Sequence, residues 1–312
     1  MKIDQERRLA QFVDRANELE NFCELLETKR KPIITVSGDG GLGKTSLLAR
    51  MINECARRNF KRAQVVWTDL RNHDYLAIMR KIRDDVGADY FKRFTHLVNC
   101  LTDPSYNLKI TFQGSSSLAD YSQFTNSAVR DMANVIIKDS MLVIPRTDSG
   151  MTANECMIHL TDQFIADLAT ATENIPLVVF FDAVEKMTEQ TRTWVWSELI
   201  QAVADGSLSN ISFVLCGRNK FEYDAELNML VEEITLKPLG QVDIEEYLVK
   251  RGIQKGGCDV LAEFLWAMTD GNPRQMAVYV DAYLLKCGKR RAEPFIAALK
   301  GIDTKTNNQP LP

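Results

Sequence analysis

A glycine-rich turn between two apolar segments constrains this chain more than any other feature. Residues 38–45 read GDGGLGKT, which satisfies every fixed position of the GxxxxGK[ST] pattern. The turn follows the β-branched run Ile33–Val36, which is typical of a strand buried on both faces. It precedes a segment that begins at about Lys44 and carries apolar residues along one helical face. Strand, glycine turn and helix in this order predict a phosphate-binding loop (P-loop).

The residue types of this loop indicate its chemistry. Glycines let successive backbone N–H groups point at phosphate oxygens, and the following helix adds the positive end of its dipole. Lys44 can reach the β- and γ-phosphates, and the Thr45 hydroxyl can ligate Mg²⁺. The expected ligands are therefore ATP or ADP with Mg²⁺. The loop residues expected to bind the nucleotide are Asp39, Gly40, Gly41, Leu42, Gly43, Lys44, Thr45 and Ser46.

A second acidic residue follows another apolar run. Leu177–Phe181 consists of five apolar residues and is followed by Asp182, a pattern that places a carboxylate at the end of a buried strand. With a P-loop upstream, we expect Asp182 to hold Mg²⁺ together with Thr45, although an Asp at this place could also cap a helix. Glu185 is the nearby candidate for polarising a water on the γ-phosphate, and its alternative is an acid in the first turn of a helix.

The rest of the chain alternates between strand and helix patterns. Strands are expected at Val65–Trp67, Ile211–Cys216 and Ile234–Leu236, and the helices between them predict a parallel α/β sheet flanked by helices. Residues from about 92 to 150 interrupt this alternation, with a helix expected near Val129–Ile137. After Pro238 the pattern is helical. We therefore expect a nucleotide-binding domain at 1–236 with an insertion at about 92–150, a helical domain at 237–300 and a flexible tail at 301–312.

Composition excludes several other classes of protein. The 312 residues are 45% hydrophobic and 26% charged with a net charge of −4, as in ordinary globular proteins. No apolar run approaches the ~20 residues of a membrane span, and the charged start MKIDQERR predicts no secretory signal. The seven cysteines are scattered without a CxxC pair, so we expect reduced thiols and a cytoplasmic protein.

Two basic clusters leave contact with DNA open. One comprises Arg57, Arg58, Lys61 and Arg62, and the other comprises Lys286, Lys289, Arg290 and Arg291. Such clusters can contact DNA phosphates. Solvated cations near the ends of helices are the alternative. The three histidines lack the spacing of a zinc site.

Several motifs, taken in order, resemble a known family. Residues 12–15 (FVDR) with Glu18-Leu19, the GGLGKT form of the loop, residues 213–218 (FVLCGR) and residues 271–273 (GNP) are similar to motifs of the STAND class. This class of AAA+-related P-loop ATPases includes the NACHT and NB-ARC switches, and the likeness is to its prokaryotic members. The resemblance spans about residues 10–285, and only the P-loop is specific by itself.

The resemblance implies further site residues and a C-terminal helical lid. Val13 and Arg15 would border the adenine, Pro273 would close the lid over the base, and Arg274 could contact phosphate. Arg218 would face the γ-phosphate and complete a catalytic set, which comprises Lys44, Asp182, Glu185 and Arg218. Their alternatives are a core valine, solvated arginines and a proline at the first position of a helix.

The resemblance also implies a function. Ala183 stands where many AAA+ motors have a glutamate, which favours slow hydrolysis. We therefore expect an ATP-binding, slowly hydrolysing switch whose nucleotide state controls self-association and signalling, with a protein partner or effector, in the manner of prokaryotic STAND proteins of antiviral defence. Two alternatives are a DNA-loading or transposition-type AAA+ ATPase and a scaffold that binds nucleotide without hydrolysing it.

Overall fold

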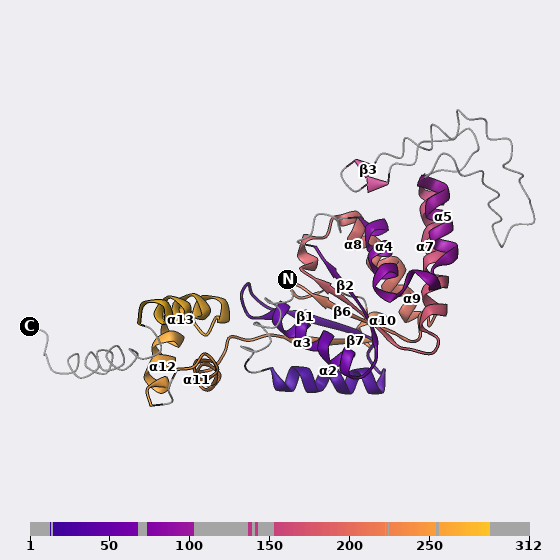
Figure 1. Cartoon of the computed structure of the whole chain (residues 1–312). Coiled ribbons are helices and arrows are strands. Elements are labelled where there is room, and N and C mark those ends of the chain that lie inside the picture. Colours follow the sequence, from indigo (N-terminus) through magenta and orange to yellow (C-terminus); the bar gives the residue numbers. More distant parts are fainter. Residues whose placement is uncertain are drawn as a thin grey trace, which may run out of the picture.

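The computed structural model describes residues 13, 15–67, 74–102, 137–138, 141–142, 153–221, 223, 225–253 and 256–287. It comprises an α/β part followed by three C-terminal helices (Figure 1). The expected tail at 301–312 lies outside the described residues, as does the expected helix near Val129–Ile137 except for Ile137. Within the described part of the chain, no helix is long and apolar enough to cross a membrane.

The α/β part is built on a five-stranded parallel sheet. Its strand order is β2-β5-β6-β1-β7, and every neighbouring pair is parallel. This confirms the predicted parallel α/β fold. Because all strands run the same way, their carboxyl ends meet at one edge of the sheet, where ligands of such sheets bind. The strands are β1 (Ile33–Ser37), β2 (Lys61–Val66), β5 (Leu177–Asp182), β6 (Ile211–Cys216) and β7 (Val231–Thr235).

Helices cover both faces of this sheet. After β5, a continuous helical run has α-helical turns on both sides of a π-helical stretch at Val195–Ile200. A separate two-stranded ribbon pairs β3 (Ile137–Lys138) with β4 (Met141–Leu142). The helices of the α/β part are α2 (Ala16–Thr28), α3 (Lys44–Arg57), α4 (Tyr75–Val86), α5 (Lys92–Thr102), α7 (Ala153–Thr172), α8 (Glu189–Trp194), α9 (Gln201–Ala204) and α10 (Ala225–Asn228).

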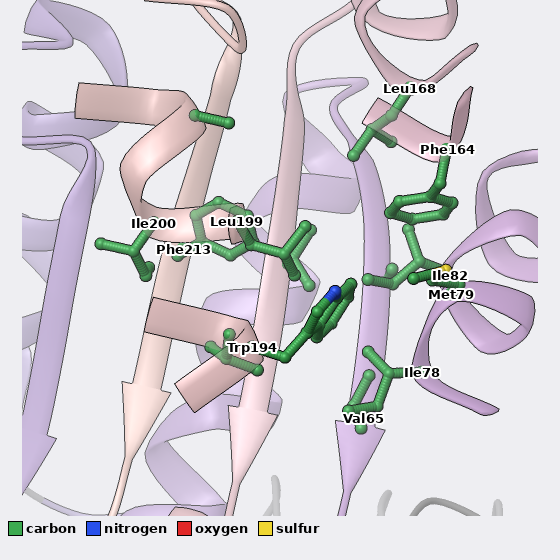
Figure 2. Packing of buried hydrophobic residues seen from close by; sticks show 14 of the residues in the cluster. Val65, Ile78, Met79, Ile82, Phe164, Leu168, Trp194, Leu199, Ile200 and Phe213 are labelled. Carbon is green, nitrogen blue, oxygen red and sulfur yellow. The ribbon is translucent and has the colours of Figure 1, made fainter. Parts of the chain in front are cut away.

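The central strands are apolar along their whole length because both of their faces are buried. Successive side chains of a strand point to opposite faces, so Ile33 packs in the cluster under α4, α7 and α8, while Ile34 packs in the cluster under α2 and α3. Figure 2 shows the first of these clusters, in which Phe213 of β6 lies among side chains from α8 and the following π-helical stretch.

Helix α5, at the start of the expected insertion, packs in the main core. Its Phe94 is fully buried in the main core, where its ring lies 5.3 Å from that of Phe164 on α7. The Phe94 N–H donates a hydrogen bond of 3.0 Å to the buried carboxylate of Asp167. Residues 92–102 therefore pack against the core of the α/β part, and the bounds of the expected insertion stay a prediction.

The C-terminal helices have a core of their own. They are α11 (Gln241–Lys250), α12 (Cys258–Thr269) and α13 (Pro273–Cys287). Ile244, Leu248, Leu265 and Met276 are buried together, and Val13 from the N-terminal segment joins them. Figure 1 places these helices beside the edge of the α/β part that carries the start of α3.

We expect Phe213→Ala to lower the free energy of unfolding by about 3–5 kcal/mol, because it opens a cavity between Phe181, which stacks on Phe213 at 5.8 Å, and the helices above. The matched control is Met229→Ala, since Met229 is 78% exposed and its truncation should change stability by about 0.5 kcal/mol or less. Urea unfolding followed by tryptophan fluorescence measures both. Equal midpoints for the two variants would contradict this assignment of the core.

Candidate functional site

The glycine-rich turn connects β1 to α3 at the carboxyl edge of the sheet. Gly41 and Gly43 have φ of +92° and +90°, which side chains rarely allow, so the turn depends on glycine at these positions. The Lys44 ammonium lies in the turn, where it donates hydrogen bonds to the carbonyls of Gly38 (2.6 Å) and Asp39 (2.8 Å). A cation held at the centre of a turn of backbone groups is suited to phosphate.

The remaining loop residues contribute differently. The Leu42 side chain is buried in the cluster under α2 and α3, so this residue offers only its backbone to a ligand. Its N–H reaches towards the Asp39 carbonyl across the loop, at an N···O distance of 3.5 Å. Asp39 and Gly40 are exposed, and Ser46 is half-buried in the first turn of α3.

The structure brings Thr45 and Asp182 together. The Thr45 hydroxyl donates a hydrogen bond of 3.0 Å to Asp182 Oδ2. Asp182 ends β5 and is 7% exposed. Burial raises the pKa of this carboxyl, and the hydrogen bond from Thr45 acts in the opposite direction. The two expected metal ligands are thus adjacent, although they are 137 residues apart in the sequence.

This pair of oxygens fits Mg²⁺. A hydroxyl and a carboxylate are hard ligands, and Mg²⁺ usually takes one or two such protein groups and completes its octahedron with water and substrate phosphates. Within the described residues, no group of three or more His, Cys, Asp or Glu side chains is placed to hold a metal. An ion at this site would take its remaining ligands from water and from the phosphates of a bound nucleotide.

Glu185 and Arg218 form an ion pair next to the loop. Ala183, with a φ of +63°, turns the chain after Asp182 into a 3-10 turn that carries Glu185. Arg218 follows β6, and its Nε lies 3.2 Å from Glu185 Oε1. A Cβ added at Gly40 would lie 3.9 Å from the Arg218 guanidinium carbon. The guanidinium therefore lies within reach of both the loop and the carboxylate.

The second oxygen of Glu185 has an unusual environment. Oε2 is buried and has no hydrogen-bond partner, which is costly for a carboxylate oxygen. An open pocket of about 690 Å³ lies beside the pair, lined by Glu185, Arg218 and the Trp196–Phe221 stack among others. A small movement of the side chain would let this oxygen accept a hydrogen bond from a water or a ligand group.

The start of α13 lies on the loop. The Asn272 Nδ2 donates a hydrogen bond of 3.0 Å to the Gly40 carbonyl, and the Arg274 N–H donates one of 3.2 Å to the Gly41 carbonyl. Pro273 is the first residue of α13, and the Arg274 side chain is exposed. Because α13 covers the loop in this way, we call α11–α13 the lid. Asn272 lies within the GNP motif at 271–273, but the sequence did not single it out as a site residue; a helix-capping residue before a proline is the signal that could have found it.

Val13 and Arg15 lie where the lid joins the α/β part. Val13 is buried in the lid core. Arg15 is 5% exposed, adopts a φ of +71°, pairs with Glu18 at 3.3 Å and donates to the Lys237 carbonyl in the connection from β7 to α11. The neighbouring Phe12 and Asp14 of the same motif lie outside the described residues.

A family model and several solved structures are similar to this chain. A family model, described as AAA ATPase domain, matches residues 11–214. A chain of the HORMA–CdnC–Trip13 complex from E. coli MS115-1 is similar with a TM-score of 0.50 and 12% identity, over 99% of this chain and 93% of that chain. Domain III of the replication initiation protein DnaA from Thermotoga maritima gives 0.46 and 13%, over 95% of each chain.

Cdc6p from Pyrobaculum aerophilum gives a TM-score of 0.49 and 14% identity over 91% of this chain, which spans only 64% of the Cdc6p chain. A comparison with curated proteins finds no match. At identities this low, the likeness to solved structures concerns the fold and nothing further.

We expect Gly41→Ala to lower the free energy of unfolding by about 1–3 kcal/mol without any ligand, because alanine is strained at this φ. The added Cβ would also lie 2.6 Å from Asn272 Oδ1 and 2.9 Å from Arg274 Cβ. Gly40→Ala is the control, since its Cβ meets only the Arg218 guanidinium carbon at 3.9 Å and should change stability by about 0.5 kcal/mol or less. Thermal unfolding compares them, and equal stability of both variants would contradict the described loop–lid contact.

Proposed function

The chain belongs to the AAA ATPase domain family, and from this premise we propose that it is an ATP-binding switch that hydrolyses ATP slowly and changes the position of its lid with the state of the nucleotide. The observation that carries the proposal is the hydrogen bond between Thr45 and Asp182. It joins the P-loop to the acidic end of a second buried strand, the pairing that Mg²⁺-dependent phosphoryl transfer requires.

In this proposal the loop residues bind and orient the triphosphate. The backbone N–H groups from Gly40 to Thr45 surround the phosphates, and Lys44 exchanges the carbonyls of Gly38 and Asp39 for β- and γ-phosphate oxygens. Thr45 and Asp182 would hold Mg²⁺, and a bound ion would neutralise charge that develops on the phosphates. The loop N–H groups, Lys44, Thr45 and Asp182 lie close together at one edge of the sheet, and this arrangement supports these roles.

Slow hydrolysis is supported by the environment of Glu185. We assign this carboxylate the task of orienting the attacking water, because its Oε2 is buried and lacks a partner. Its other oxygen is paired with Arg218 at 3.2 Å, so part of the carboxylate is engaged until this pair opens. When Arg218 turns to a γ-phosphate it releases Glu185, so one arginine both detects the γ-phosphate and frees the carboxylate.

The switch depends on contacts that ATP offers and ADP lacks. Arg218 gains a charged partner only when the γ-phosphate is present, and a ligand shifts a conformational equilibrium by its difference in affinity for the two states. We propose that lid closure around ATP exposes a surface for self-association and that hydrolysis reverses it. The STAND class, a role in signalling or defence, and a protein effector remain predictions.

The DNA-loading alternative is less favoured by the described residues. Arg57 pairs with Glu54 at 2.8 Å, Arg58 pairs with Glu27, and Lys61 donates a hydrogen bond of 2.9 Å to the Ala171 carbonyl. Three cations of the first basic cluster are therefore engaged within the fold. Of the second cluster, Lys289, Arg290 and Arg291 lie outside the described residues.

The scaffold alternative differs from the switch because a scaffold would bind nucleotide without turnover.

We expect Glu185→Gln to reduce ATP turnover by about 100-fold or more, because the amide cannot accept a proton from the attacking water, while ATP binding persists. Phosphate release with Mg²⁺ measures turnover, and fluorescence of a mant-labelled ATP analogue measures binding. The matched control is Glu189→Gln, which removes a carboxylate that is 81% exposed and paired with Arg192 and should leave turnover unchanged.

Two further results complete this test. Lys44→Ala should abolish binding, and removal of Mg²⁺ with EDTA should stop turnover. Wild-type turnover in Glu185→Gln would remove Glu185 from the catalytic set. A wild-type protein that retains ADP through purification and releases no phosphate would favour the scaffold.

We expect the solution mass to rise to a defined oligomer with a non-hydrolysable ATP analogue and Mg²⁺, and to stay that of a monomer with ADP and Mg²⁺. The reason is that closure of the lid depends on the γ-phosphate. Light scattering coupled to size-exclusion chromatography measures the mass, and Lys44→Ala is the control that should stay monomeric throughout. An unchanged mass with both nucleotides would contradict self-association of this chain.

A further inference from the structure

Asn272 uses one side-chain amide for two separate contacts. Its Oδ1 accepts hydrogen bonds from the N–H groups of Arg274 (3.1 Å) and Gln275 (3.3 Å), which caps the start of α13. Its Nδ2 donates to the Gly40 carbonyl at 3.0 Å. The reverse orientation of the amide would face Nδ2 at two donors and Oδ1 at a carbonyl, so the contacts fix the orientation.

Helix capping alone does not require asparagine at this position. Asp, Ser and Thr cap helices about as well, but an ionised Asp has no donor for the Gly40 carbonyl and the shorter Ser has a single hydroxyl for both tasks. An amide supplies an acceptor and donors at the same distance from the backbone. The identity of residue 272 is therefore explained by the contact with the loop.

A second bond from α13 reaches the next loop carbonyl. Pro273 has no N–H, so Arg274 is the first residue of α13 that can donate from its backbone, and its N–H lies 3.2 Å from the Gly41 carbonyl oxygen. The carbonyls of Gly40 and Gly41 thus both face the lid. The absence of a side chain at Gly41 allows this approach, since a Cβ there would lie 2.6 Å from Asn272 Oδ1.

These two bonds determine where the loop N–H groups point. In a planar trans peptide the carbonyl and the following N–H point in opposite directions. Carbonyls of Gly40 and Gly41 that face α13 therefore turn the N–H groups of Gly41 and Leu42 away from it. The Leu42 N–H agrees, because it reaches towards the Asp39 carbonyl on the inner side of the loop at 3.5 Å.

We propose that Asn272 is a positioning residue, which aligns the N–H groups of the P-loop for phosphate and thereby ties the lid to the loop. The inference rests on the proposed function in one respect, that the loop binds a nucleotide. Its contacts are with the backbone of Gly40 and Gly41 and involve no γ-phosphate. Asn272 therefore sets the affinity for ATP and ADP alike, whereas Arg218 distinguishes the two.

The test compares Asn272→Ser and Asn272→Asp with the wild-type full chain, using mant-ADP and mant-AMPPNP with Mg²⁺ as probes. We expect Asn272→Ser to weaken both by about three- to tenfold, the value of one backbone-directed hydrogen bond, and to leave their ratio unchanged. Asn272→Asp should weaken both further, because its carboxylate faces the Gly40 carbonyl and the bound phosphates. Asn53→Ser, on the exposed face of α3, is the control.

Hydrogen exchange without nucleotide provides a second measurement. We expect faster exchange of the amides at residues 41–44 in Asn272→Ser and Asn272→Asp, with protection of α13 retained because both residues still cap it. Loss of α13 protection in both variants would reduce Asn272 to a helix cap and overturn the proposal. Unchanged affinities together with unchanged loop exchange would overturn it as well.

The two proposals fail in different ways. If the wild-type chain binds neither probe, the proposed function is wrong, and the exchange measurement then judges the role of Asn272 in the loop alone. If the wild type binds both probes and Asn272→Ser changes the ratio of their affinities, the residue acts on the γ-phosphate and the assignment to the loop backbone is wrong.

Discussion

The site depends on three parallel strands that end level with one another. Val36 of β1, Cys216 of β6 and Asp182 of β5 share one register row. The loop after β1 must therefore pass over the end of β6 for Thr45 to reach Asp182. Cys216 allows this because it is small and fully buried, and burial raises the pKa of its thiol so that it remains neutral beside Asp182. Parallel pairing thus places Asp182 next to the loop, although the two are distant in the sequence.

The second constraint is the close approach of the lid, which is made through backbone groups. Gly271 has a φ of +69°, and a Cβ there would lie 2.2 Å from the Leu239 carbonyl oxygen. The Leu239 N–H donates to the Gly271 carbonyl at 2.9 Å. Gly271 therefore contacts the connection from β7 to α11 at Leu239. Asn272 and Arg274, at the other end of the same segment, contact the P-loop. A lid attached in this way cannot move without breaking hydrogen bonds to the loop.

Local signals in the sequence predicted the P-loop, the apolar strands and Asp182, because each depends on a few consecutive residues. The contacts that complete the site connect distant segments, and Asn272 and Gly40 are 232 residues apart. Helix α5 was not predicted because no strand pattern follows its segment, so the segment does not show the alternation of strand and helix by which the other helices were found. Strand β7 was expected at Ile234–Leu236 and runs from Val231 to Thr235, since Glu232 at the sheet edge interrupts the apolar pattern while pairing with Lys31.

The ion pair and the lid contact differ in strength, and this difference suits two separate tasks. The Arg218 side chain is 62% exposed, and pairs this exposed are worth about 0–1 kcal/mol. Arg218 can therefore exchange Glu185 for a phosphate at little cost, as a detector of the γ-phosphate must. The bonds of Asn272 and Arg274 are directed at backbone carbonyls that are present in every nucleotide state. On the proposed function, these bonds keep the start of α13 on the loop with either nucleotide, while the response of the rest of the lid to ATP comes from the exposed arginine.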